Sequence, residues 1–239
     1  MDTLTPVTPE HRALWEGAAR ALRRGIILGE IEAGARLDET QIANKLGVSR
    51  LPVREAFAQL AREGLVRIEP RRGAFAVGIT DADISALYDV RSYLECHAVR
   101  QAIRVANDSD IARLFSLVEQ MEGHLHNGMP RLIVEPDLEF HRWIVSLPGN
   151  RWLVSAWETM VGVIEAMLSI TDLSADMTGP VAGHRRLATT IRERDEEGAV
   201  ELMSRHRGAA RLLIGIRQAA REVNACCKST TGIKGAEGR

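Results

Sequence analysis

In the first eighty residues, short apolar stripes alternate with turn signals. Apolar side chains recur every three or four positions in residues 12–29, which indicates an amphipathic helix. Two shorter helices are predicted at residues 39–46 and 49–63. Each begins at a residue that favours an N-cap, Asp38 or Ser49, and each ends at a glycine. The pattern therefore predicts three helices before the first strand signal.

A small hairpin is predicted after these helices. Residues 65–68 and 74–77 are apolar or alternate in polarity, and the segment 69–73 between them contains a proline and a glycine that favour a turn. Three helices followed by a two-stranded hairpin is the order of elements in a winged helix-turn-helix. We therefore predict such a domain, with a role in DNA binding, in residues 1–79.

The strand signals stop at about Thr80, and long amphipathic segments separated by turns take their place. We expect six helices, at residues 81–106, 109–127, 132–147, 150–170, 181–194 and 196–223. Six helices without strands predict an all-α bundle over residues 80–225. A polar, glycine-rich flexible tail is expected at residues 226–239. The predicted fold class is thus mainly α, a winged domain followed by a six-helix bundle.

Composition narrows the class of protein. Apolar and charged fractions of 45% and 26% are typical of a globular chain. No apolar run approaches the roughly 20 residues of a membrane helix, and the first ten residues lack the pattern of a secretory signal. The cysteines Cys96, Cys226 and Cys227 match neither a disulfide framework nor a zinc motif. We expect a cytoplasmic protein with no membrane partner. The net charge of −1 does not argue against DNA, because phosphate binding depends on where basic side chains lie.

The helix predicted at residues 49–63 has the chemistry of a DNA-reading helix. Its apolar face consists of Val53, Ala56, Phe57 and Leu60. Arg50 and Arg54 lie one turn apart on another face, near the end that enters the major groove. An arginine can donate two hydrogen bonds to guanine O6 and N7 or to phosphate oxygens. Arg71 and Arg72 at the hairpin tip are placed to reach phosphates or the minor groove. The alternative is a solvated helix face beside an ordinary basic turn.

This region resembles the DNA-binding domain of GntR-superfamily regulators. The resemblance rests on LGVSRLPVREA at residues 46–56, LAREGLV at 60–66 and RGAF at 72–75. It implies that residues 39–58 form the helix-turn-helix and that its arginines contact operator DNA. The predicted DNA-binding residues are Ser49, Arg50, Arg54, Arg71 and Arg72. The chain departs from the family at residues 33–34, where Ala-Gly replaces Pro-Gly, and at Thr40, where some FadR-like members carry arginine.

Four polar side chains lie on the apolar faces of the predicted bundle helices: Asp137, His141, His184 and His206. The first two are four residues apart on one helix and share a face. His184 and His206 lie eleven residues before and after a turn near Asp195. In an antiparallel pair this places both at the same height, roughly 16 Å from the turn. One carboxylate and three imidazoles inside a bundle suit a divalent metal ion with an open position, foremost zinc, with nickel, manganese or iron as alternatives. For each histidine alone, the alternative is a hydrogen-bonded core residue.

The C-terminal half resembles the FCD effector domain of the FadR subfamily, in its six-helix VanR-type branch. The resemblance rests on DVRSYLE at residues 89–95, DLEFH at 137–141, PGN at 148–150, HRRL at 184–187 and His206. It implies that the four predicted ligands hold a metal facing a cavity for a small organic acid. Arg91 is the candidate partner of the acid's carboxylate. The alternative for Arg91 is an ion pair with Glu95, one turn further on.

These features predict a homodimeric, ligand-responsive transcription regulator, more specifically a repressor, and not an enzyme. Two winged domains would read two half-sites of a near-palindromic operator. Two other classes of function fit the same residues. One is a metal-dependent enzyme, because one aspartate and three histidines with an open position can activate water. The other is a DNA-binding module whose helical domain only dimerises.

Overall fold

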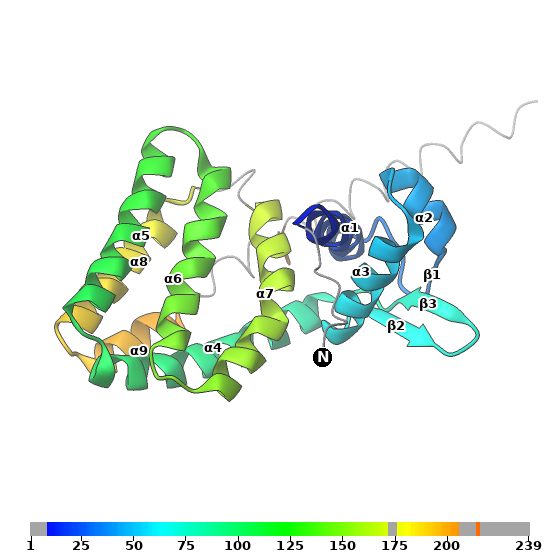
Figure 1. Ribbon diagram of the computed structural model, residues 1–239. Coiled ribbons are helices and arrows are strands. Elements are labelled where there is room, and N and C mark those ends of the chain that lie inside the picture. Colours follow the sequence, from blue (N-terminus) through cyan, green and yellow to red (C-terminus); the bar gives the residue numbers. More distant parts are fainter. Residues whose placement is uncertain (1–8, 172–175, 206–213, 216–239) are drawn as a thin grey trace, which may run out of the picture.

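The computed structural model describes residues 9–171, 176–205 and 214–215 of the chain. Figure 1 shows a helical bundle on one side and a smaller domain with a hairpin on the other, with α7 (Arg151–Thr171) standing between them. The architecture is mainly α, as the hydrophobic pattern predicts. α7 packs against both parts and so connects them.

The N-terminal part is the predicted winged helix-turn-helix. Its elements are α1 (Pro9–Leu28), β1 (Arg36–Leu37), α2 (Glu39–Leu46), α3 (Arg50–Arg62), β2 (Val66–Glu69) and β3 (Gly73–Ala76). β2 and β3 form the expected antiparallel hairpin, with Val66 opposite Ala76. The strand β1 was not predicted. It pairs with β3, so the sheet order is β1-β3-β2. A strand of two residues is too short to show an alternation of polarity.

Local signals position α2 and α3. The Asp38 carboxylate accepts hydrogen bonds from the backbone N–H groups of Thr40 and Gln41, both at 2.8 Å. Gly47 ends α2 with a φ of 68°, in the left-handed region that favours glycine. Ser49 occupies the N-cap position of α3, but its side chain makes no capping hydrogen bond. Asp38 therefore fixes the start of α2, and Gly47 makes the tight turn that leads into α3.

The C-terminal part contains six α-helices within the described residues. They are α4 (Asp81–Val105), α5 (Asp108–His126), α6 (Val134–Ser146), α7, α8 (Thr178–Arg192) and α9 (Glu196–Ser204). A short 3₁₀ helix, η1 (Pro130–Ile133), takes up the start of the segment expected to be α-helical from residue 132. The helix predicted at residues 196–223 begins as expected and α9 ends at Ser204. The predicted tail at residues 226–239 lies outside the described residues.

The hydrophobic core forms two clusters, and α7 contributes to both. Trp157 and Ile164 of α7 belong to the cluster inside the bundle, whereas Val163 and Met167 belong to the cluster beneath α1 and α3. The segment Arg151–Ile170 is also long and apolar enough to cross a membrane by length and composition alone. A helix that supplies two cores has the same composition, so the shared packing accounts for this property.

α7 also covers a buried ion pair of the winged domain. Arg23 of α1 donates hydrogen bonds from Nε and Nη2 to the two carboxylate oxygens of Glu63, both at 2.7 Å. The two side chains are 7% and 1% exposed. A Cβ atom on Gly162 of α7 would lie 2.7 Å from Arg23 Nη2 and 3.0 Å from Glu63 Oε1. Only glycine therefore fits at position 162 without displacing the pair.

Candidate metal centre and DNA-reading surface

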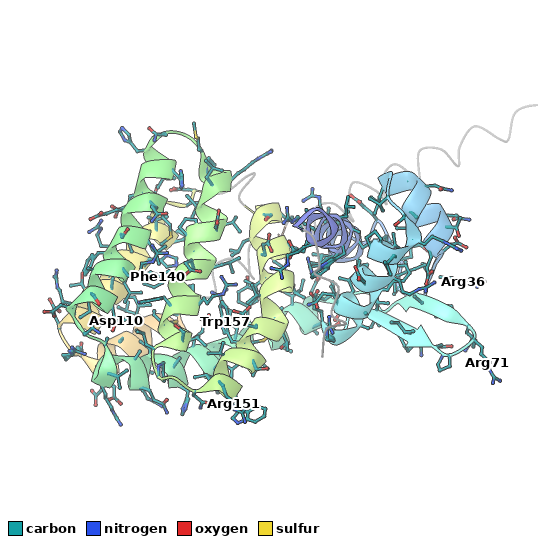
Figure 2. The ribbon with its side chains drawn as sticks, in the orientation of Figure 1. Arg36, Arg71, Asp110, Phe140, Arg151 and Trp157 are labelled. Carbon is teal, nitrogen blue, oxygen red and sulfur yellow. The ribbon has the colours of Figure 1, made fainter. Side chains whose placement is uncertain are left out.

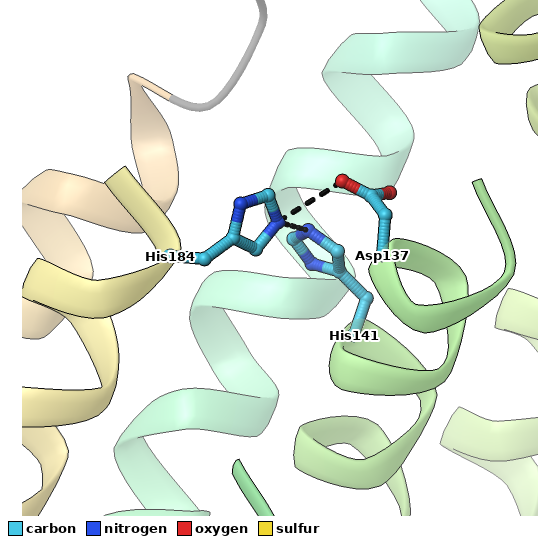
Figure 3. Close-up of side chains that lie close together, drawn as sticks. All are labelled: Asp137, His141 and His184. Atoms are coloured by element: carbon cyan, nitrogen blue, oxygen red, sulfur yellow. Dashed lines mark hydrogen bonds and ion pairs between the residues drawn. The ribbon is translucent and has the colours of Figure 1, made fainter. Parts of the chain in front are cut away.

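Two helices bring together three of the predicted metal ligands. Asp137 and His141 lie one turn apart on α6, and His184 faces them from α8 (Figure 3). All three side chains are buried, with exposures of 6%, 0% and 1%. Each offers a possible ligand atom, and these atoms lie within 4.8 Å of one another. The i, i+4 spacing read from the sequence is thus completed by a helix more than forty residues away.

The hydrogen-bond partners assign the tautomers of the two imidazoles. His184 Nδ1 lies 3.0 Å from the backbone oxygen of Pro180, which can only accept a hydrogen bond. His141 Nδ1 lies 3.2 Å from Glu95 Oε1, a carboxylate oxygen. Both Nδ1 atoms thus face an oxygen acceptor, an arrangement that favours the tautomers whose Nε2 lone pairs point into the site. Partners of this kind, a backbone carbonyl and a carboxylate, orient metal-binding histidines in proteins.

The two lone pairs meet each other and a carboxylate. His184 Nε2 lies 3.3 Å from His141 Nε2 and 3.0 Å from Asp137 Oδ1. A nitrogen lone pair so close to a second nitrogen and to a carboxylate oxygen requires either a shared proton or a metal ion between them. Asp137 Oδ2 is also buried, and no described residue donates a hydrogen bond to it. Nitrogen and oxygen ligands of this type, already held in place by outer partners, fit a divalent metal ion.

Glu95 of α4 connects the candidate ligands to two other helices. Its Oε1 atom accepts hydrogen bonds from Arg91 Nε at 2.8 Å and from Trp157 Nε1 at 2.9 Å, besides facing His141. Burial alone would raise the pKa of Glu95, but Arg91 and His141 outweigh it and hold that pKa well below its usual range. Glu95 is therefore an ionised carboxylate inside the bundle, compensated by two hydrogen-bond donors and the nearby His141.

Electrostatics keep Asp137 and His141 in the forms that bind metal. The pKa of Asp137 would rise on burial, but His184, His141 and Arg91 bring it below the usual value, so the carboxylate is ionised. Burial lowers the pKa of His141, and the nearby Glu95 only partly offsets this effect. A neutral imidazole beside an ionised carboxylate is the state in which both residues coordinate a cation.

The predicted DNA-binding residues are all exposed. Ser49, Arg50 and Arg54 lie at or near the N-terminal end of α3, and all three are exposed. Arg71, also exposed, lies at the tip of the β2–β3 hairpin (Figure 2), where its φ of 64° places it in the left-handed region. Arg72 is exposed beside it and forms an ion pair with Glu69. The opposite face of α3, with Val53, Ala56, Phe57 and Leu60, is buried as predicted.

Family models match both halves of the chain. The model described as "Bacterial regulatory proteins, gntR family" matches residues 14–76, and the model described as "FCD domain" matches residues 86–209. This chain belongs to the GntR family. It is a DNA-binding regulator with a winged helix-turn-helix and an FCD domain, as its motifs predict.

Relatives of this GntR-family regulator share most of its length. The HTH-type transcriptional regulator YdhC of Bacillus subtilis is 29% identical over 188 residues, which cover 77% of this chain and 84% of YdhC. The gluconate operon transcriptional repressor of the same species is 28% identical over 194 residues, 79% of each chain. The solved structure of Escherichia coli McbR/YncC has a TM-score of 0.65 at 20% identity, covering 87% of this chain and 98% of that one, and shares the fold.

The structure of the GntR-family regulator separates the predicted site residues into three groups. Asp137, His141 and His184 come together, whereas the fourth predicted ligand, His206, lies outside the described residues. Arg91 forms the ion pair with Glu95 that the sequence offered as the alternative to an effector contact. Its Nη2 atom nevertheless remains buried, with no hydrogen-bond partner in the described part of the chain.

Two residues of the site were missed by sequence reasoning. Glu95 was considered only as a partner of Arg91, and its contact with His141 joins helices 46 positions apart in sequence. Trp157 belongs to the apolar stripe of α7, and no neighbouring residue signals that its indole N–H reaches a carboxylate. A buried tryptophan usually finds a hydrogen-bond acceptor, but the sequence does not identify which one.

Proposed function

We propose that this regulator is a cytoplasmic, homodimeric repressor whose FCD domain senses a small organic acid at a bound divalent metal ion. The observation that carries the sensor proposal is the convergence of two imidazole lone pairs and one carboxylate, all buried, between α6 and α8. Asp137, His141 and His184 would hold the ion, zinc first among the candidates, with His206 proposed as a further ligand. A bound metal would supply a positive charge to which a carboxylate can coordinate.

Arg91 supports a carboxylate as the effector group. Glu95 holds its Nε atom, which leaves the buried Nη2 atom available to a ligand. The Tyr88 hydroxyl, one turn earlier on α4, is also buried without a hydrogen-bond partner among the described residues. Burial raises the pKa of Tyr88 to about 12 although Arg91 acts against it, so the hydroxyl stays a neutral donor. These two donors, together with the charge of a bound metal ion, favour an anionic effector that bridges the metal and α4.

The effector proposal predicts a stabilisation that depends on metal. Hydroxy acids such as lactate, citrate and gluconate will be screened by thermal unfolding, with zinc-loaded and chelator-treated protein in parallel. A cognate acid present at about 100 times its Kd adds roughly 2.7 kcal/mol to the stability of the folded state. We expect the melting temperature to rise only in the zinc-loaded sample. Equal shifts in both samples would mean that the acid binds away from the metal.

The DNA-binding proposal assigns operator contacts to Ser49, Arg50, Arg54, Arg71 and Arg72. Residues 1–79 would form the DNA-binding domain, and residues 80–225 would bind the effector and dimerise. Two symmetry-related winged domains would then place two α3 helices in successive major grooves. The acid would act by favouring one relative pose of the two domains over another, and operator DNA would weaken acid binding by the same factor.

Arg54→Ala is the direct test of the operator contact. Loss of one arginine contact to a base will weaken operator binding by about 1–3 kcal/mol. The metal content will stay unchanged, because Arg54 is an exposed residue of α3, whereas the candidate ligands lie on α6 and α8. Fluorescence anisotropy with a labelled operator duplex measures the first quantity and elemental analysis the second. Operator affinity equal to that of the unaltered protein would remove Arg54 from the proposed surface.

A further inference from the structure

The guanidinium of Arg54 is held by a carboxylate from the neighbouring helix. Arg54 Nη2 donates to Glu39 Oε2 at 2.9 Å, and Arg54 Nε lies 3.2 Å from Glu39 Oε1. Glu39 is the first residue of α2, directly after the Asp38 N-cap, and Arg54 lies in the second turn of α3. The contact therefore crosses the helix-turn-helix, between the supporting helix and the helix proposed to read DNA.

This pair contributes little to the stability of the fold. The Arg54 and Glu39 side chains are 66% and 33% exposed, and exposed ion pairs are weak because water screens the two charges. A bidentate contact does, however, fix the plane of the guanidinium. The hydrogen bond from Arg54 lowers the pKa of Glu39, and the charge of Arg50 acts in the same direction. Glu39 is thus an ionised group beside both arginines of the proposed reading surface.

The orientation of the pair leaves a second edge of Arg54 for DNA. A guanidinium has five N–H groups, and Glu39 uses one from Nε and one from Nη2. The remaining N–H groups, on Nη1 and Nη2, form the edge that can donate to guanine O6 and N7. A carboxylate beside this edge also repels phosphates, so it disfavours a contact between Arg54 and the DNA backbone.

We propose that Glu39 is a positioning residue, which holds Arg54 in the pose for reading a base and thereby raises discrimination between operator and non-specific DNA. This inference rests on the proposed operator contact of Arg54. It assigns to Glu39 a role in specificity, although Glu39 itself need not touch the DNA. Removal of Glu39 would then leave general affinity intact and reduce selectivity.

The test measures the affinity of the full-length protein for two DNA duplexes. An operator duplex is first selected from a randomised pool, and a scrambled duplex of the same length serves as non-specific DNA at the same salt concentration. We expect Glu39→Gln to lower the ratio of the two affinities by roughly fivefold or more, the low end of what a bidentate base contact discriminates. Binding to the scrambled duplex will stay the same or become tighter, because a negative charge has been removed.

Three variants separate positioning from other effects. Glu16→Gln removes the same charge from an exposed position on α1 and should leave the ratio unchanged. Glu39→Asp keeps the charge but shortens the side chain, so it should lower the ratio as Glu39→Gln does. An unaltered ratio in Glu39→Asp would mean that charge alone matters and would overturn the positioning role. The melting temperature should change little in all three variants.

Arg54→Ala distinguishes failure of the inference from failure of the proposed function. If Arg54→Ala lowers the affinity ratio but Glu39→Gln does not, Glu39 has no positioning role and the operator contact stands. If Arg54→Ala leaves the ratio unchanged, the operator contact fails and the inference fails with it. In the double variant, the Glu39 change should have no further effect on the ratio. An additional loss there would show that Glu39 acts independently of Arg54.

Discussion

Replacing Glu63 by alanine will lower the free energy of unfolding by about 3–5 kcal/mol, the cost of leaving one partner of a buried ion pair uncompensated. Arg23 would keep its charge in a site that is 7% exposed and covered by Gly162. Gln59, which donates to the same carboxylate at 2.9 Å, would lose its acceptor as well. The midpoint of urea unfolding, measured on the full-length protein, gives this quantity.

Two controls make the result specific to burial. The double variant Arg23→Met with Glu63→Leu removes both charges at similar volume and should recover most of the loss. Glu196→Ala breaks the exposed pair with Arg104, whose side chain is 69% exposed, and should cost less than about 1 kcal/mol. If Glu63→Ala were as mild as Glu196→Ala, water would have to reach the pair in solution.

His184→Ala will weaken zinc binding by more than about 100-fold, because loss of a ligand exceeds the 10–100-fold effect typical of an outer partner. Removal of this imidazole leaves only the two ligands of α6 among the described residues. Zinc is the probe. The protein is stripped with a chelator, dialysed and titrated calorimetrically, and bound zinc is then measured by elemental analysis. Affinity of the metal-free variant for operator DNA should match that of the metal-free parent protein.

Two control variants test whether the effect is specific to a metal ligand. His97→Ala alters an exposed histidine of α4 that contacts Gln101, and it should leave zinc affinity unchanged. Glu95→Gln keeps the ligands but replaces the carboxylate beside His141, so an intermediate loss of 10–100-fold is expected. Zinc affinity that survives His184→Ala intact would place any bound ion elsewhere. His206→Ala tests the proposed fourth ligand in the same assay.

The winged domain was predictable because its signals are local. The Asp38 cap and the glycine turn at Gly47 each act within a few residues, and the hairpin follows from two short apolar runs around a turn. β1 escaped prediction because its two residues gain their partners only when β3 folds beside them. The 3₁₀ helix η1 escaped for a similar reason, since its apolar residues fit the same periodicity as the α-helix that follows.

The candidate site was predictable only where one helix defines it. The spacing of Asp137 and His141 guarantees a common face, and the apolar neighbours of His184 predict that it points inward. One oxygen of Glu95 lies against side chains from α4, α6 and α7. This convergence depends on how three helices are aligned against one another, and a single sequence does not show that alignment. The outer partners of the site therefore require coordinates.

The two domains of this regulator are not independent modules, because α7 packs into both of them. The helix contributes side chains to the core of each half, and at Gly162 its backbone lies against the charge pair of the winged domain. In a chimaera of this winged domain with a different FCD domain, the winged domain would lose the part of its hydrophobic core that α7 supplies. The replacement helix would need matching apolar side chains and a glycine at the position of Gly162. The two halves can therefore be exchanged only together with the α7 face that both of them use.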